Sequence, residues 1–169
     1  LPGSMAIGHT RYSTTGDSAL LNAQPIRVDS TKGLIAIAHN GNLVNLGNIR
    51  ARLEREGAYF QTTSDSEIIV QLIAHSKSSA LVDAIADSLS QVDGAFSIVM
   101  MTRDRIFAAR DPSAFRPLSM GRLPHPDGPA PLVFASETCA FDLLRAEYER
   151  DVLPGELVMV TEDGVTSRQ

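Results

Sequence analysis

The sequence predicts an α+β fold in which antiparallel sheets pack together and helices lie on the outside. Short apolar runs of strand length come in neighbouring pairs, and segments with helical spacing gather between those pairs. Strands and helices do not alternate regularly, as they would in a parallel βαβ sheet. With 169 residues, 43% of them hydrophobic, the chain has the size and the apolar content of one domain.

The predicted strands are apolar runs with turn residues on their flanks. They cover residues 34–38, 95–101, 106–109, 132–135 and 157–160. After the last run, Glu162, Asp163 and Gly164 predict a hairpin turn toward Val165, because glycine tolerates positive φ. Four prolines between residues 122 and 131 predict a surface loop between two strands.

Helical spacing of apolar residues predicts helices over residues 46–56, 65–75, 80–92 and, for a short fourth one, 137–144. Gly57 suits the C-cap of the first helix. At the start of the second helix, Ser64 and Glu67 have the spacing of a capping box. In such a box Ser64 accepts a hydrogen bond from the amide three residues on, and Glu67 reaches back to the amide of Ser64.

Asp65 is predicted in the first turn of the second helix, where the helix dipole stabilises an ionised carboxylate. The capping pattern alone explains an acidic residue at this position. The same position suits an Asp that accepts hydrogen bonds from the ammonium group of a substrate. The sequence leaves both interpretations open.

Residues 39–42, His-Asn-Gly-Asn, directly follow a predicted strand. One interpretation is a tight turn, because Asn and Gly tolerate left-handed backbone. The other is an oxyanion hole, in which the side-chain amide of Asn40 and the backbone amide of Gly41 converge on a developing alkoxide. Such a donor contributes about 3–4 kcal/mol to stabilising the transition state.

Arg11 lies in a segment that reads as a strand end, where a surface salt bridge is one interpretation. The other is a bidentate clamp on a carboxylate, which the planar guanidinium suits better than a lysine would. Tyr12 and Thr14 add hydroxyl groups beside it. His9 and His39 are interpreted as hydrogen-bonded structural residues, since the sequence places no acidic partner near them.

The composition excludes several functions. With 15 basic and 20 acidic residues and a net charge of -5, the chain has no footprint for nucleic acid or an anionic membrane. No apolar stretch approaches the roughly 20 residues of a membrane-spanning helix. The one cysteine, Cys139, excludes an internal disulfide and a multi-cysteine metal site, so no metal site is predicted, and it suits a reducing, cytoplasmic setting. No base lies near Cys139, which we predict to be a buried packing residue.

Taken in order, the polar segments resemble the class II (N-terminal-nucleophile) glutamine amidotransferases, most closely the glutaminase domain of the glutamine phosphoribosylpyrophosphate amidotransferases. Glucosamine-6-phosphate synthases would instead show Arg-Trp-Ala-Thr-His at residues 11–15. The resemblance rests on residues 8–14 (Gly-His-Thr-Arg-Tyr-Ser-Thr), 23–25 (Ala-Gln-Pro), 38–43 (Ala-His-Asn-Gly-Asn-Leu), 62–67 (Thr-Thr-Ser-Asp-Ser-Glu), 94–95 (Gly-Ala), 110–112 (Arg-Asp-Pro), 116–118 (Arg-Pro-Leu), 135–138 (Ala-Ser-Glu-Thr) and 154–156 (Pro-Gly-Glu).

The resemblance implies a four-layer αββα fold and a glutamine site. In that site Arg11, with Tyr12 and Thr14 beside it, grips the α-carboxylate, Asp65 binds the α-ammonium group, and Asn40 with Gly41 forms the oxyanion hole. The family's nucleophile is an N-terminal cysteine that forms a thioester with the substrate and releases ammonia.

On this resemblance we expect residues 1–169 to be a single glutaminase domain, truncated at both ends and incomplete at its N-terminus, without the nucleophilic cysteine and inactive by itself. The parent would form 5-phosphoribosylamine for purine biosynthesis from L-glutamine and phosphoribosyl pyrophosphate, as a homo-oligomer. No cofactor is expected in this domain, and Mg²⁺ is expected in the parent's phosphoribosyltransferase domain. The alternatives are a glucosamine-6-phosphate synthase type of glutaminase and a non-catalytic glutamine-binding domain.

Overall fold

A computed structural model describes residues 3–10, 20–126 and 128–169 of the chain. Two antiparallel sheets dominate it. The larger sheet contains, in spatial order, β1 (Ile26–Ser30), β2 (Gly33–Leu43), β3 (Gly94–Met101), β4 (Ile106–Arg110), β8 (Leu157–Thr161) and β9 (Gly164–Arg168). The smaller sheet contains β6 (Leu132–Ala135), β5 (Ser119–Arg122) and β7 (Glu147–Asp151). The helical elements are the 3-10 turn η1 (Leu20–Asn22), α1 (Leu46–Arg55), α2 (Asp65–His75), α3 (Leu81–Leu89) and α4 (Cys139–Leu144).

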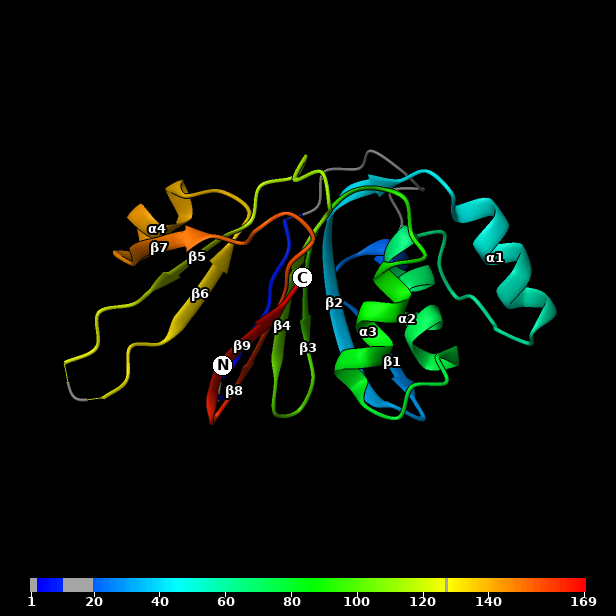
Figure 1. The fold of residues 1–169 in the computed structure, drawn as a ribbon, viewed down its shortest axis with the longest axis horizontal. Helices are drawn as coiled ribbons and strands as arrows, with labels where there is room; N and C mark the ends of the chain where they lie inside the picture. Colours follow the sequence, from blue (N-terminus) through cyan, green and yellow to red (C-terminus); the bar gives the residue numbers. More distant parts are fainter. Residues whose placement is uncertain (1–2, 11–19, 127) are drawn as a thin grey trace.

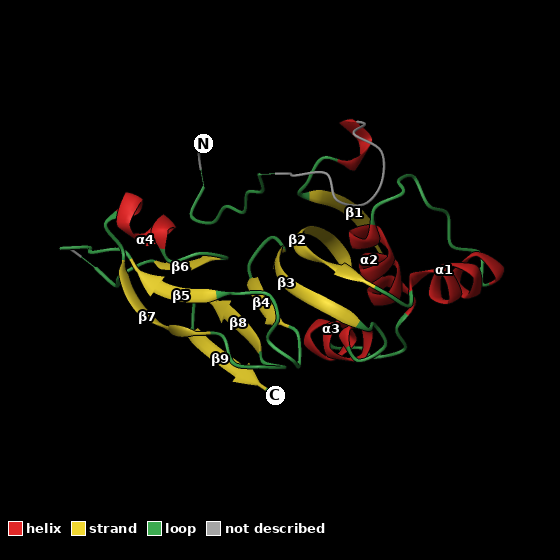
Figure 2. Ribbon diagram, turned by 90° about the horizontal axis from the view of Figure 1, so that it is seen from above, coloured by secondary structure: helices red, strands yellow, loops and turns green. Residues whose placement is uncertain are grey.

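The elements form four layers, as Figures 1 and 2 show. Helices α2 and α3 cover one face of the larger sheet, and their apolar side chains, among them Ile69 and Ile85, form one core with Ile37 of β2. A second, smaller core lies between the two sheets and includes Leu118 and Val158. On the far side of the smaller sheet, α4 buries Phe141. The predicted αββα arrangement is confirmed.

Strand β2 presents alternate side chains to opposite layers, as the pleat of a strand requires. Ile37 and His39 face the helices, since Ile37 belongs to the helix-side core and the ring of His39 lies against Asp65 of α2. Ala38 and Asn40 face the smaller sheet and line a cavity between the sheets together with Phe134. Two neighbouring residues of β2 therefore serve two different layers.

The predicted strands and helices are present, but β2 is longer than the sequence indicated. It continues through residues 39–43, so the interpretation of this segment as a tight turn is wrong. The reason is Gly41, which pairs with Phe96 of β3. A Cβ at this position would lie 2.1 Å from the carbonyl oxygen of Ala95, so only glycine permits the two strands to come this close.

Both glycines that were predicted at turns have positive φ. Gly164, with φ of 127°, closes the hairpin between β8 and β9. Gly57, with φ of 94°, lies one residue later relative to α1 than predicted, because the C-cap itself is Glu56. Strands β1, β5 and β7 were not predicted, because their sequences mix polar and apolar side chains without a continuous apolar run. Strand β7 is exposed over most of its length.

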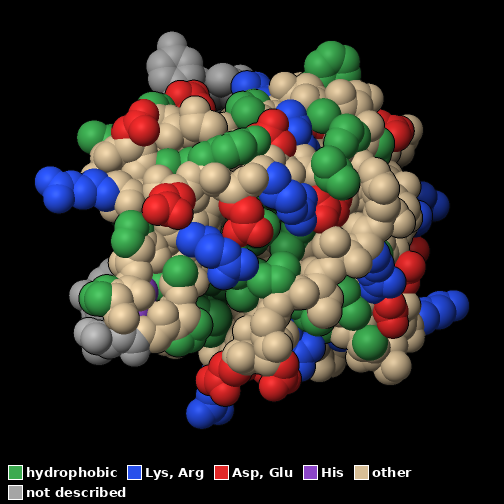
Figure 3. Space-filling model, turned by 60° about the vertical axis from the view of Figure 1, so that its left-hand side comes forward, with side chains coloured by type: hydrophobic (Ala, Val, Ile, Leu, Met, Phe, Trp, Pro, Cys, Tyr) green, Lys and Arg blue, Asp and Glu red, His purple; other side chains and the backbone are tan. Residues whose placement is uncertain are grey.

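In the described part of the chain, no helix has the length and apolar character needed to cross a membrane. The face of the molecule in Figure 3 carries basic and acidic side chains side by side. Neither sign forms a continuous field on this face, which agrees with the net charge of -5.

Candidate functional site

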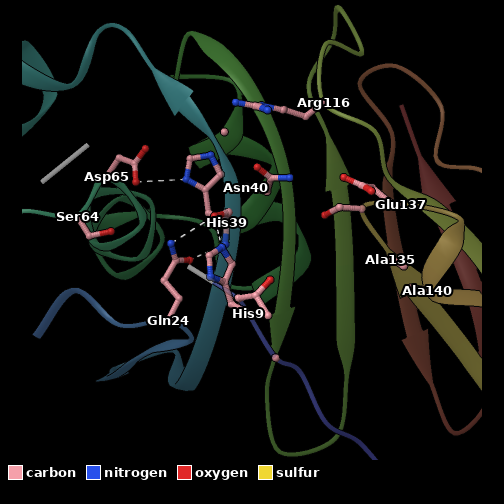
Figure 4. A pocket seen from close by; sticks show the side chains of 14 residues that line it. His9, Gln24, His39, Asn40, Ser64, Asp65, Arg116, Ala135, Glu137 and Ala140 are labelled. Carbon is pink, nitrogen blue, oxygen red and sulfur yellow. Dashed lines mark hydrogen bonds and ion pairs between the residues drawn. The ribbon is translucent and has the colours of Figure 1, made fainter. Parts of the chain in front are cut away.

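A cavity of about 810 Å³ lies where the ends of the two sheets meet. Figure 4 shows its two walls. One wall comes from β2 and the start of α2, with Asn40 and Asp65, and the other from β6 and the residues before α4, with Glu137. Gly8, His9 and Thr10 also line it, so the described beginning of the 8–14 segment reaches the cavity.

Asp65 is the first residue of α2 and lies at the cavity wall. Ser64 is the N-cap, and its hydroxyl accepts a hydrogen bond from the amide of Ser66 at 3.3 Å. The same amide donates to Oδ1 of Asp65 at 2.9 Å. Asp65 thus stands in the first helical turn, as predicted, with its carboxylate turned back over the end of the helix.

The predicted capping box is wrong in both halves. The Ser64 hydroxyl accepts from the amide two residues on and not from that of Glu67, whose amide donates to the Ser64 carbonyl at 3.3 Å. Glu67 does not reach back to Ser64 but accepts hydrogen bonds from the amides of Gln61 and Thr62, at 2.8 and 2.7 Å, and from the Thr62 hydroxyl at 2.6 Å. The amide of Ser64 instead donates to the Thr62 hydroxyl at 3.1 Å. The loop before α2 folds back over the helix end, so the buried Glu67 carboxylate fastens this loop and thereby the position of Asp65.

His39 gives Asp65 a partner that the sequence did not indicate. Nδ1 of His39 lies 3.3 Å from Oδ1 of Asp65, and both side chains are buried. Burial acts to raise the pKa of Asp65, but the hydrogen bond and the electrostatic attraction of His39, with the amide of Ser66, outweigh it and hold the pKa below the ordinary 3.8. The carboxylate is therefore ionised at neutral pH and presents an anion to the cavity.

His39 lies opposite Ile98 of β3, but on the other side of β2 its backbone is held by side chains and not by β1. Gln24 accepts from the His39 amide at 2.7 Å and donates to its carbonyl at 3.3 Å, and Nε2 of His9 donates to the same carbonyl at 3.1 Å. Both histidines are hydrogen-bonded, as the sequence interpretation expected. Sequence reasoning assigned no role to Gln24, although it belongs to the Ala-Gln-Pro motif of the resemblance.

Asn40 and Gly41 follow His39 on β2, and both line the cavity. Asn40 also lines the adjoining cavity of about 130 Å³ between the sheets. Gly41 lies so close to the ring of His39 that an added Cβ would stand 2.6 Å from its Nε2. The structure thus brings Asp65, Asn40 and Gly41 to one cavity. Their assigned roles toward a substrate stay predictions.

Residues Arg11, Tyr12 and Thr14 lie outside the described residues. Arg116 lines the cavity in the described part of the chain, and the 110–118 motif explains how it is mounted. The Arg110 guanidinium donates to the carbonyls of Ala114, Arg116 and Val152. The buried Asp111 carboxylate accepts from the amides of Phe96, Ser113, Phe115 and Arg116. This charged pair of residues builds the loop and leaves Arg116 at the cavity.

Cys139 does not match the prediction of a buried packing residue. It is exposed at the first position of α4, where Phe141 is the residue that packs inward. It is not part of the lining of the large cavity. Among the described residues, no group of three or more His, Cys, Asp or Glu side chains could hold a metal ion.

Comparison with known protein families identifies the family of this chain. A model of the glutamine amidotransferase domain matches residues 9–143. The chain belongs to this family. The chain is 50% identical to amidophosphoribosyltransferase 1, chloroplastic, of Arabidopsis thaliana and 44% identical to the amidophosphoribosyltransferase of Bacillus subtilis. Both matches cover 99% of this chain. It spans 29% and 34% of the lengths of these two relatives.

Solved structures agree with this assignment. The glutamine phosphoribosylpyrophosphate amidotransferase of B. subtilis, complexed with ADP and GMP, matches 95% of the amidotransferase chain with a TM-score of 0.86 at 42% identity, over 34% of that protein. A glutamine aminotransferase class-II domain protein from Silicibacter pomeroyi shares the fold, with a TM-score of 0.57 at 17% identity over 80% of this chain and 65% of its own. The class II resemblance and the N-terminal-nucleophile hydrolase fold are thereby confirmed.

Proposed function

We propose that the protein to which this chain belongs is an amidophosphoribosyltransferase. This domain takes ammonia from L-glutamine, and the transferase half joins the ammonia to phosphoribosyl pyrophosphate, which gives 5-phosphoribosylamine for purine biosynthesis. The names of relatives at 40–50% identity support this choice over a glucosamine-6-phosphate synthase type. The main support for a glutamine site is that the ionised carboxylate of Asp65 lines the same cavity as Asn40 and Gly41.

Different residues would bind different parts of glutamine. Asp65 accepts hydrogen bonds from the α-ammonium group, and Arg11, with Tyr12 and Thr14, binds the α-carboxylate. A buried anion next to a cation is favourable because little water screens the pair. The side-chain amide of Asn40 and the backbone amide of Gly41 donate to the oxygen of the glutamine amide as it becomes an alkoxide.

The chemical step needs a thiolate, which attacks the amide carbon, forms a thioester and expels ammonia, and water then releases glutamate. Cys139 does not suit this role, because it is exposed on α4 and does not line the cavity. We therefore propose that these 169 residues alone do not hydrolyse glutamine. Glutamate release from the purified chain that disappears in Cys139→Ala would contradict this proposal.

No step assigned to this domain requires a cofactor. Mg²⁺ belongs to the transferase half, where it would accompany the pyrophosphate of the second substrate. The intact protein is proposed to act as a homo-oligomer in the cytoplasm, a reducing compartment that suits a chain with one unpaired cysteine.

The experiment compares two nitrogen sources in the intact protein. Asp65→Asn removes the anion and should raise the KM for glutamine at least tenfold, while synthesis from ammonium salts continues. Asp29→Asn, the same substitution at an exposed residue of β1, is the matched control and should change neither activity. Equal loss of both activities in Asp65→Asn would contradict the substrate-binding role. Wild-type protein that forms glucosamine 6-phosphate instead of 5-phosphoribosylamine would contradict the proposed function.

A further inference from the structure

His39 lies between the two parts of the proposed glutamine site. On one side its Nδ1 lies 3.3 Å from Oδ1 of Asp65, the same oxygen that accepts from the amide of Ser66 at 2.9 Å. No side chain of the described residues hydrogen-bonds Oδ2 of Asp65. One carboxylate oxygen is therefore fixed from within the protein, and the other is left for a ligand in the cavity.

On its other side the imidazole of His39 lies against Gly41. Nε2 would stand 2.6 Å from a Cβ on Gly41, so the ring occupies the space that any larger residue there would need. Within the described residues Nε2 is buried and has no hydrogen-bond partner. The side chain is 1% exposed, which leaves it no room to rotate away from Asp65.

The ring position is fixed through the backbone as well. Strand β1 begins at Ile26, which pairs with Ile37, so no strand residue pairs with His39 on that side of β2. The side-chain amide of Gln24 takes this place and binds both the amide and the carbonyl of His39. Because its backbone is held by Gln24 and its ring is buried, His39 has a fixed position from which it can orient Asp65.

We propose that His39 is a positioning residue for glutamine recognition: its Nδ1–H fixes Oδ1 of Asp65 so that Oδ2 faces the α-ammonium group of the substrate. This inference rests on the proposed function of the site. His39 acts through Asp65 and does not itself touch the substrate. This role needs a proton on Nδ1 of His39, the nitrogen that faces the carboxylate. A proton on Nε2 is not needed, because Nε2 faces no acceptor among the described residues.

Two replacements separate positioning from packing. In His39→Asn the side-chain amide nitrogen falls near the place of Nδ1 and can still donate to Asp65, whereas in His39→Gln the nitrogen falls nearer the place of Nε2. If His39 positions Asp65, His39→Asn keeps the KM for glutamine within a few-fold, and His39→Gln raises it at least tenfold. If His39 only fills space, the order is reversed, because Gln is the closer match in volume.

A double-mutant cycle in the intact enzyme completes the test. In the Asp65→Asn background, His39→Gln should raise the KM for glutamine less than about threefold, since the group through which it acts is already gone. Multiplicative effects would overturn the inference, and so would a lower KM in His39→Gln than in His39→Asn. If His39→Gln does not fold, His39→Leu, which also lacks the donor, takes its place in the cycle.

Controls distinguish the possible failures. His75→Asn and His75→Gln alter an exposed histidine at the end of α2 and should leave the KM unchanged. Thermal midpoints of all variants report on folding. Wild-type enzyme without any glutamine-dependent 5-phosphoribosylamine would overturn the proposed function, and this inference with it. Normal wild-type activity with the reversed order of the two His39 variants would overturn the inference alone.

Discussion

The two walls of the cavity differ in what supports them. The wall with Asp65 and Asn40 belongs to β2 and α2, which pack into the large core between the helices and the six-stranded sheet. The opposite wall, around Glu137, belongs to the three-stranded sheet and α4, where Phe141 is the buried residue of the helix. The proposed contacts of Asp65 with the α-ammonium group, and of Asn40 and Gly41 with the reacting amide, thus lie on the well-packed wall.

Because the wall of the three-stranded sheet and α4 has the smaller core, we predict that it unfolds locally while the wall of β2 and α2 stays folded. Phe141→Ala removes the packing of α4 against Gly121 and Tyr148 and should cost about 3–5 kcal/mol. Hydrogen exchange should accelerate in β5 and β7, while β2 keeps its protection. Leu143→Ala, at an exposed position of the same helix, should change stability by less than about 0.5 kcal/mol. Equal acceleration in both sheets would show that the two walls unfold together.

On the wall of β2 and α2, the next largest effect on stability is expected where β2 and β3 approach each other closely. Gly41→Ala places a Cβ 2.1 Å from the Ala95 carbonyl oxygen, so the strands must separate, at a cost of about 1–3 kcal/mol. Gly47→Ala in α1 meets no atom within 4 Å and should be neutral or stabilise by up to about 1 kcal/mol. Urea unfolding of both variants measures the difference. A Gly41→Ala protein as stable as Gly47→Ala would refute the steric role of Gly41.

Glu67 tests whether the loop before α2 is fastened as the structure indicates. Glu67→Gln replaces a carboxylate that accepts three hydrogen bonds by an amide with one acceptor oxygen, which leaves a buried donor unpaired. The expected loss is about 1–3 kcal/mol in urea unfolding. Glu54→Gln, which breaks an exposed pair with Arg50, should cost about 0.5 kcal/mol at most. Similar losses in the two variants would mean that Glu67 contributes no more than a surface charge.

The sequence predicted the parts of this architecture that depend on local pattern. Apolar runs gave the central strands, and helical spacing gave α1, α2 and α3. Strand β7 was missed because it is exposed and carries mostly charged side chains, so its strand state comes from pairing with β5. At the site, Asp65, Asn40 and Gly41 were found from their residue types. The contacts of His39 with Gln24 and Asp65 were not, because they join residues that only the folded chain brings together.

An ion pair between Arg150 and Glu156 joins the two sheets that form the walls. Its loss should have the smallest effect on stability of those predicted, and that effect should depend on pH. Arg150 of β7 binds the buried Glu156 before β8 through two hydrogen bonds of 2.8 and 2.9 Å. Burial acts to raise the pKa of Glu156, but Arg150 and the amide of Leu153 outweigh it, so the pKa is lowered from 4.5. A lowered pKa stabilises the folded state above the unfolded pKa, and this contribution is lost as the pH falls through the folded value.

Glu156→Gln should therefore be less stable than wild type at neutral pH, by an amount that is constant above the ordinary pKa of 4.5 and shrinks below it. Urea midpoints of the two proteins between neutral and acid pH measure this gap. Glu162→Gln, at an exposed residue of the β8–β9 turn, should show no gap at any pH. A gap that stays constant into the acid range would mean that the link depends on shape and not on the Glu156 charge. The two walls would then be joined by packing alone.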